Sequence, residues 1–75
     1  MKVLFFASLA EITGKSELEI SGVTSVADLK AALEKQFPGI ESLKYAIAVN
    51  NKIVNGDQLL NDKDEIAFLP PFSGG

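Results

Sequence analysis

The chain ends with Glu65-Ile66-Ala67-Phe68-Leu69-Pro70-Pro71-Phe72-Ser73-Gly74-Gly75, the stretch around which its other elements can be placed. Residues 65–69 have the apolar, β-branched and aromatic character of a strand. The two prolines end the pairing of that strand, because proline lacks an N–H and fixes φ, and they begin a stiff extended segment. Gly74 and Gly75 carry no Cβ and would fit a narrow channel in another protein. The sequence therefore predicts a strand that carries an insertable tail, with the α-carboxylate of Gly75 as its reactive group.

Length and composition exclude several classes of protein. A chain of 75 residues forms one small domain with a single core. Without cysteine or histidine it lacks thiolate ligands, a cysteine nucleophile, the commonest metal ligand and the commonest general base, so we expect no metal site and no catalysis by the chain alone. The net charge of −3 disfavours nucleic acid as a partner. The longest apolar run, residues 3–7, is too short to span a bilayer, so we expect a cytoplasmic protein without membrane contact.

Hydrophobic periodicity predicts the elements before this tail. Residues 3–7 read as a central strand, 8–13 as a short helical turn and 16–20 as an alternating edge strand. Ser25-Val26-Ala27-Asp28 has the form of a capping box and begins a helix that Pro38-Gly39 ends. The buried stripe expected on this helix is Val26, Leu29, Leu33 and Phe37.

The second half of the chain alternates strands and turns. Residues 40–44 are predicted to be loop, and strands 45–49 and 52–54 are joined by Asn50-Asn51, residues that tolerate the left-handed backbone of a hairpin turn. Leu59-Leu60 is an expected apolar anchor between turns. The order predicts an α+β fold, a mixed sheet packed on one main helix, with the first and last strands adjacent at its centre. Residues 1–69 would form the domain and 70–75 its tail.

The two central strands are apolar at both alternations, which predicts a core on one face and a partner on the other. The expected core residues are Val3, Phe5, Leu29, Leu33, Ile66 and Phe68. The expected partner face consists of Leu4, Phe6, Ala67 and Leu69, extended by Ile53. Ordinary surface apolarity is the alternative for this second set. We favour a partner, because these residues would form one patch leading to the tail.

Asp62, Asp64 and Glu65 precede or begin the last strand and allow two interpretations. They could form a cluster of metal ligands, or an acidic turn that caps the strand. We favour the cap, with electrostatic attraction to a basic partner as a minor addition.

The chain resembles the small, sulfur-carrying subunits of molybdopterin synthase, which are ubiquitin-like β-grasp proteins. The resemblance covers nearly the whole chain. Its marks are the opening strand 3–7 followed by Glu11 and Gly14, the helix start Ser25-Val26, the Val49-Asn50 turn, and residues 64–75, where acidic turn, apolar strand, two prolines and Gly-Gly follow one another. Three positions depart from the family's usual residues: Ala10 replaces a frequent arginine, Lys63 a frequent glycine and Phe72 a frequent valine. The first puts in doubt a salt bridge to the large subunit.

The resemblance implies a sulfur carrier that is not an enzyme by itself and binds no cofactor. An activating enzyme, similar to the E1 enzymes of ubiquitin transfer, would adenylate Gly75 with ATP and magnesium. A sulfur donor such as a cysteine desulfurase or rhodanese would supply sulfur for a thiocarboxylate. The large subunit would take up the tail, residues Pro70, Pro71, Phe72, Ser73 and Gly74, and the sulfur would pass to cyclic pyranopterin monophosphate within a heterotetramer.

Three alternatives stay open from the sequence. A thiamin thiazole sulfur carrier would share the fold and the Gly-Gly end. A ubiquitin-like modifier would use the same tail as an acyl donor to lysines. A plain β-grasp interaction domain would not need Gly75 at all.

Overall fold

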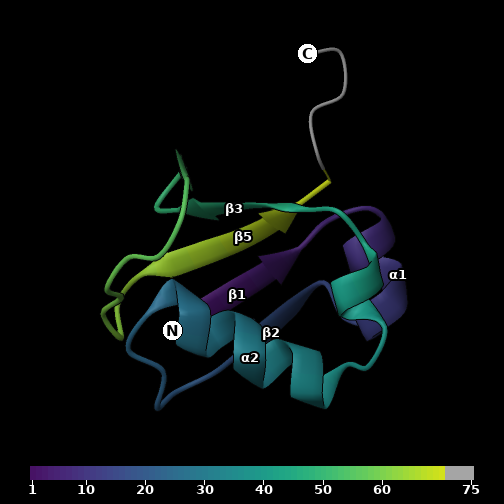
Figure 1. Ribbon diagram of the computed structural model, residues 1–75, viewed down its shortest axis with the longest axis horizontal. Helices are drawn as coiled ribbons and strands as arrows, with labels where there is room; N and C mark the ends of the chain where they lie inside the picture. The colour runs from purple at the N-terminus through teal and green to yellow at the C-terminus, as the bar shows by residue number, and fades with distance from the viewer. Residues whose placement is uncertain (71–75) are drawn as a thin grey trace.

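The computed structural model describes residues 1–70, which form two layers: a five-stranded sheet and a main helix across one of its faces (Figure 1). The predicted α+β plan, a mixed sheet with one main helix, is confirmed. The elements are β1 (Lys2–Phe5), α1 (Ser8–Thr13), β2 (Glu17–Glu19), α2 (Val26–Gln36), a 3₁₀ helix η1 (Ile40–Ser42), β3 (Ala46–Val49), β4 (Lys52–Val54) and β5 (Glu65–Leu69).

The strand order is β2-β1-β5-β3-β4, so β5 occupies the middle of the sheet. Strand β1 runs parallel to β5, whereas the other neighbouring pairs are antiparallel. The predicted adjacency of the first and last strands is therefore confirmed, with Val3 opposite Ile66 and Phe5 opposite Phe68. Because β5 is paired on both sides, its C-terminal end is held by two neighbours.

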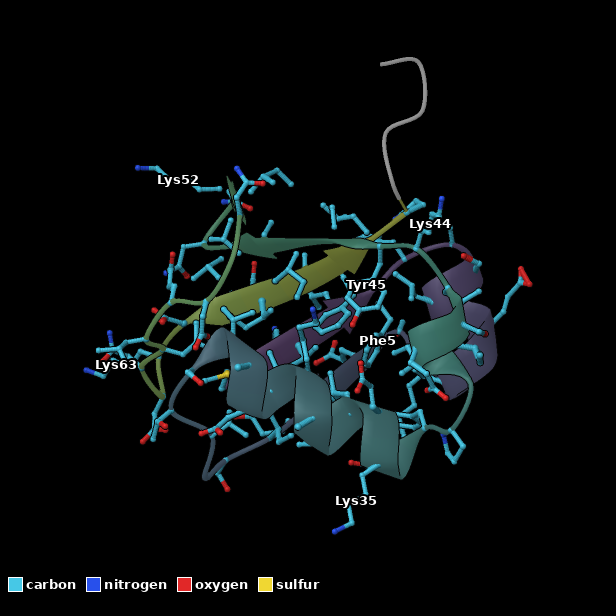
Figure 2. The ribbon with its side chains drawn as sticks, in the orientation of Figure 1. Phe5, Lys35, Lys44, Tyr45, Lys52 and Lys63 are labelled. Carbon is cyan, nitrogen blue, oxygen red and sulfur yellow. The ribbon has the colours of Figure 1, made fainter. Side chains whose placement is uncertain are left out.

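The core lies between the sheet and α2. All six residues predicted for it are buried, and five of them have no exposed surface. Aromatic rings fill the end near η1, where the Phe5 ring centroid lies 6.1 Å from that of Phe37 and 5.8 Å from that of Phe68. Figure 2 shows Phe5 and Tyr45 directed into the space between the layers, whereas Lys35 projects from the surface. The helix stripe is confirmed for Val26, Leu29 and Leu33; Phe37 follows the last helical residue and is half-buried.

Local hydrogen bonds explain where α2 and the β3–β4 hairpin begin and end. The N–H of Asp28 donates to Oγ of Ser25 at 3.1 Å, and the Asp28 carboxylate accepts from Oγ1 of Thr24 at 2.8 Å. This exchange is the predicted capping box, extended to the residue before the cap. In the hairpin turn Asn50 and Asn51 have φ values of 50° and 71°, the left-handed conformations that the prediction required.

Three features differ from the sequence-based expectations. Residues 40–42 form a 3₁₀ helix rather than a loop, because Ile40 is drawn fully into the core. The first strand ends at Phe5 instead of residue 7, since Ala7 adopts φ 54° and ψ −127° and begins the turn into α1. Of the expected Leu59-Leu60 anchor only Leu60 is buried; Leu59 is 81% exposed.

Candidate functional site

The face of the sheet opposite α2 is not covered by any helix of residues 1–70 (Figure 1). Pairing register places Leu4 opposite Ala67, Ala67 opposite Ala48, and Ala48 opposite Ile53. Directly paired residues share a face of the sheet, so these four side chains form one row across β1, β5, β3 and β4. Leu69, two residues after Ala67 in β5, extends the same face toward the end of the strand.

This open face is concave. It contains a hollow of about 330 Å³ lined by Leu4, Phe6, Ala48, Asn51, Ile53, Glu65, Ala67 and Leu69. All five residues predicted for the partner face, Leu4, Phe6, Ile53, Ala67 and Leu69, line it together. Small alanines occupy its floor, while Phe6 and Ile53 are 44% and 48% exposed. A small floor between large side chains suits an inserted apolar group.

Ala48 was missed by the sequence-based prediction, although its alternation with Ile47 carries the signal. Ile47 belongs to the core, so the next residue must face the opposite side of the sheet. Ala48 is nevertheless only 5% exposed, because its methyl group is covered by its larger neighbours on this face. The short side chain deepens the hollow at the middle of the sheet.

The hollow reaches the end of the strand that precedes the tail. Leu69 closes β5 beside Ala46 of β3, and on the other side the N–H of Phe6 donates to the carbonyl of Phe68 at 3.2 Å. Pro70 follows and is half-buried. The predicted tail residues Pro71, Phe72, Ser73, Gly74 and Gly75 lie outside the described residues.

The acidic turn before β5 serves as a cap, as predicted. The Asp64 carboxylate accepts from the N–H of Asn61 at 2.8 Å and from Nδ2 of Asn50 at 2.9 Å, and Oδ1 of Asn50 accepts from the N–H of Glu65 at 3.0 Å. These donors, the backbone N–H of Asn61 first, hold the pKa of Asp64 below its ordinary value. The turn therefore ties the β3–β4 hairpin to the start of β5. Within residues 1–70 no three acidic side chains are grouped as metal ligands.

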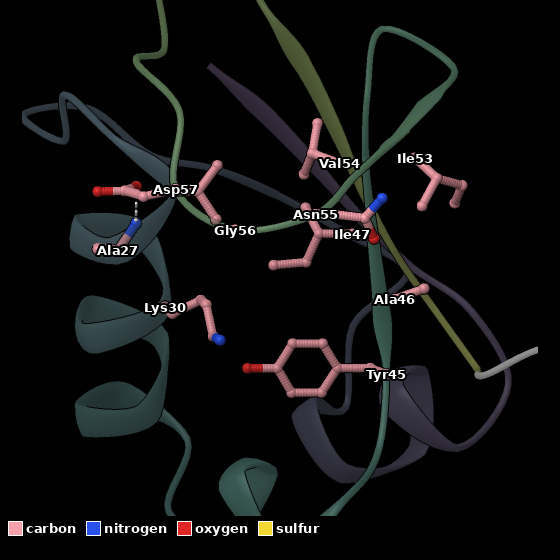
Figure 3. Close-up of a pocket in the computed structure, with 11 residues that line it drawn as sticks. Ala27, Lys30, Tyr45, Ala46, Ile47, Ile53, Val54, Asn55, Gly56 and Asp57 are labelled. Carbon is pink, nitrogen blue, oxygen red and sulfur yellow. Dashed lines mark hydrogen bonds between the residues drawn. The ribbon is translucent and has the colours of Figure 1, made fainter.

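A second hollow of about 390 Å³ lies between α2 and the β3–β4 end of the sheet (Figure 3). It is lined by Val26, Ala27, Lys30, Tyr45, Ala46, Ile47 and residues 53–57. Lys30 and Tyr45 point toward each other across it, with Lys30 Nζ 5.8 Å from the ring centroid. Burial first, and then the charges of Glu34 and Glu41, raise the pKa of Tyr45. Periodicity did not predict this hollow, because it joins three segments that are distant in the sequence.

No helix within residues 1–70 combines the length and the apolar character needed to cross a membrane.

The fold and its uncovered sheet face place the chain in the ubiquitin-like β-grasp class. The archaeal modifier protein SAMP1 from Methanosarcina acetivorans superimposes with a TM-score of 0.78 at 33% identity, over 99% of this chain and 94% of that one. A structure described as putative molybdopterin converting factor subunit 1 from Pyrococcus furiosus gives a TM-score of 0.88 at 28% identity, over 95% of both chains. The class of fold is thus shown by two independent neighbours.

The family follows from the sequence match. Residues 3–75 match the ThiS family, and the chain belongs to it. The molybdopterin synthase sulfur carrier subunit of Escherichia coli K12 is 36% identical over 100% of this chain and 99% of its own length. The human protein of the same name is 40% identical over 100% of this chain and 93% of its own length. The resemblance stated from the sequence is therefore confirmed.

The fold neighbours also include an assembly. A structure titled as the protein–protein complex of subunits 1 and 2 of molybdopterin-converting factor from Helicobacter pylori contains a chain 27% identical to this one. It superimposes with a TM-score of 0.72 over 99% of this chain and 96% of that one. In that complex, a chain of this fold is bound to a second subunit.

Proposed function

We propose that this chain is the sulfur carrier of molybdenum cofactor biosynthesis, the small subunit of molybdopterin synthase, and is not catalytic by itself. The observation that carries the proposal is the full-length match to proteins named molybdopterin synthase sulfur carrier subunit. The open, concave face beside the tail-bearing end of β5 supports it, because a carrier must dock on an enzyme while presenting its terminus.

The proposed chemistry takes place at the α-carboxylate of Gly75. A carboxylate is a poor electrophile, so an E1-like enzyme uses ATP and magnesium to convert it to an acyl adenylate, with release of pyrophosphate. The terminal persulfide sulfur of a donor such as a cysteine desulfurase or rhodanese then attacks the carbonyl carbon, and AMP leaves. A thiol next reduces the S–S bond of the acyl disulfide so formed, and becomes a mixed disulfide with the donor as the thiocarboxylate is released. The resulting thiocarboxylate is a soft nucleophile that is ionised at neutral pH. All catalytic groups come from the partner enzymes.

In the proposed final step the large subunit binds the open face and receives the tail. An apolar side chain of that subunit would occupy the hollow lined by Leu4, Phe6, Ile53, Ala67 and Leu69. The thiocarboxylate would then transfer its sulfur to cyclic pyranopterin monophosphate, in a heterotetramer of two small and two large subunits. Ala10 packs against the core in α1 and offers no charge to this contact, so binding would depend on the apolar face.

A second function is favoured by one specific observation. The archaeal neighbour at 33% identity is called a small modifier protein, so a protein of this fold and similarity carries a modifier's name. The same acyl adenylate of Gly75 would react with a lysine amine to form an amide. The thiazole carrier remains an alternative within the ThiS family, but the cited full-length relatives carry the molybdopterin synthase name.

Complementation tests the proposed function. The intact chain is expected to restore molybdenum cofactor production in a strain that lacks its own small subunit, and a chain without Gly75 is expected to fail. The matched control is Leu59→Ala, which alters an exposed residue outside the open face. Restoration by the chain lacking Gly75 would mean that its carboxylate does no chemistry. Rescue of a thiazole-deficient strain alone would favour the thiamin alternative.

A further inference from the structure

The hollow between α2 and the β3–β4 end of the sheet, called here the edge groove, has no part in the proposed sulfur chemistry. Strand β4 lies at one edge of the sheet, beside β3, so its other side pairs with no strand in residues 1–70. The edge groove lies on the helix-covered side of the sheet, between β4 and α2 (Figure 3). An unpaired edge beside a groove is a place where an extended chain can add.

The phase of the β3–β4 hairpin shows which backbone groups are free. Asn50 and Asn51 form a two-residue turn closed by Val49 and Lys52, and such a closing pair exchanges two hydrogen bonds. The bonding alternates, so Ile47 and Val54 also bond each other, whereas the N–H and C=O of Ile53 point away from β3. Ile53 therefore presents one donor and one acceptor at the free edge.

The edge groove has an apolar floor and one lysine, Lys30, that forms no ion pair within residues 1–70. Ile47 is buried and Val54 is half-buried, and both belong to the core side of the hairpin. Among residues 1–70 no carboxylate lies within ion-pair distance of Lys30. Asp57, the other charged residue of the lining, already accepts from the N–H groups of Ala27 at 2.8 Å and Gln58 at 2.9 Å. Lys30 is accordingly available to pair with an acidic group of a ligand.

We propose that the edge groove binds an extended segment of a partner protein, which pairs with β4 as an added strand. Alternate side chains of a strand share one face and are about 7 Å apart. An aliphatic side chain of the segment would pack on Ile47 and Val54, and an acidic side chain two residues away would lie at Lys30. Neither the tail nor its carboxylate takes part, so peptide binding at the edge groove can be tested without sulfur transfer. Ile53 lines both hollows, and its variants are therefore read by peptide binding alone.

The test is an NMR titration of the isotope-labelled full chain with the blocked peptide acetyl-Thr-Leu-Thr-Asp-Thr-amide. Its leucine and aspartate fall on one face of an extended strand. We expect chemical-shift changes at Tyr45, Val54 and Gly56. We also expect slower hydrogen exchange of the Ile53 amide with solvent. A peptide with lysine in place of aspartate should bind about fivefold more weakly. The variant Lys30→Glu should reverse that preference, whereas Lys35→Glu, on the outer side of α2, should leave it unchanged (Figure 2).

Two further variants separate the backbone from the side chain. Ile53→Pro removes the outward N–H without removing a β3–β4 hydrogen bond, and an edge strand tolerates proline. It should abolish binding, while Ile53→Ala should retain it. Equal binding by both variants, or no effect of Lys30→Glu, would overturn the proposal. Changes confined to the open face would also overturn it. Chemical shifts that change on dilution without peptide would indicate that a second copy of the chain occupies the edge groove, and would overturn the proposal. Stronger peptide binding after deletion of residues 71–75 would indicate that the chain's own tail occupies it, with the same consequence.

Discussion

The two faces of β5 differ in what covers them. Ile66 and Phe68 have no exposed surface and lie under α2, whereas Ala67 and Leu69 line the open hollow. Both sets are apolar, so hydrophobicity alone does not separate the face that stabilises the domain from the face available to a partner. The difference is in the covering layer. The strand thus packs under the helix on one side and presents an open apolar surface on the other.

The largest expected effect is the loss of stability on the covered face. Leu33→Ala leaves a cavity under α2, at a side chain with no exposed surface, and should lower the free energy of unfolding by about 2–5 kcal/mol. Ile53→Ala on the open face, matched in chemistry, should cost about 1 kcal/mol or less. Urea unfolding followed by circular dichroism measures both. Similar losses would mean that the two faces contribute alike to stability.

Leu69→Lys makes the reverse test on the open face. It places a charge in the proposed apolar contact and should weaken binding of the large subunit by at least about 2 kcal/mol. Titration calorimetry with the purified large subunit measures the affinity, and thermal unfolding checks that the variant is folded. Leu59→Lys is the matched control, because Leu59 is 81% exposed and lies outside the hollow. An unchanged affinity for Leu69→Lys would remove Leu69 from the partner face.

The backbone at Ala7 gives a smaller effect, at the point where β1 leaves the sheet. With φ 54° and ψ −127° a residue bearing a Cβ is strained by about 1–3 kcal/mol. Ala7→Gly should therefore raise the free energy of unfolding by about 1 kcal/mol, after the entropic cost of glycine. Gly14→Ala, at φ 72° with no atom near an added Cβ, should lower it by about 1 kcal/mol. Chemical denaturation of both variants checks the signs, and a destabilising Ala7→Gly would show that the strain is absent.

The smallest expected effect is the pH dependence contributed by the acidic turn. The folded pKa of Asp64 lies below its unfolded value, so its contribution is present above the unfolded pKa and is lost as pH falls through the folded pKa. The melting temperature of the wild type should thus fall more steeply than that of Asp64→Asn between neutral pH and about pH 2. Asp62→Asn is the control, because the Asp62 side chain makes no hydrogen bond within residues 1–70. Parallel curves of melting temperature against pH for the wild type and Asp64→Asn would show that the Asp64 carboxylate does not stabilise the fold.

The sequence predicted most of what depends on periodicity and local hydrogen bonds. The helix of residues 26–36, its capping box at Ser25, the hairpin at Asn50-Asn51 and both faces of β5 were read from residues close together in the chain. What it did not predict depends on tertiary approach. Residues 40–42 form a 3₁₀ helix in which the side chain of Ile40 is buried in the core. Lys30 lies over the Tyr45 ring across the edge groove only when the helix packs on the sheet.

The open face was predicted as a set of five residues, yet its concavity was not. Alternation assigns a side chain to a face, but the depth of the hollow follows from Ala48, which the register places between Ala67 and Ile53. Because its side chain is short, the apolar face is hollowed at this point instead of flat. The register of four strands is needed for that inference, and no single segment contains it.

The central proposal is that the terminal carboxylate of Gly75 exchanges an oxygen for sulfur. Intact-mass analysis tests it most directly, on the chain isolated from cells that contain the activating enzyme and the sulfur donor but lack the large subunit, so that the loaded form accumulates. We expect a species heavier by the difference between one sulfur and one oxygen atom, with the change located in the terminal glycine by fragmentation. Recovery of the chain only as the carboxylate, or only as conjugates to lysines of other proteins, would contradict it.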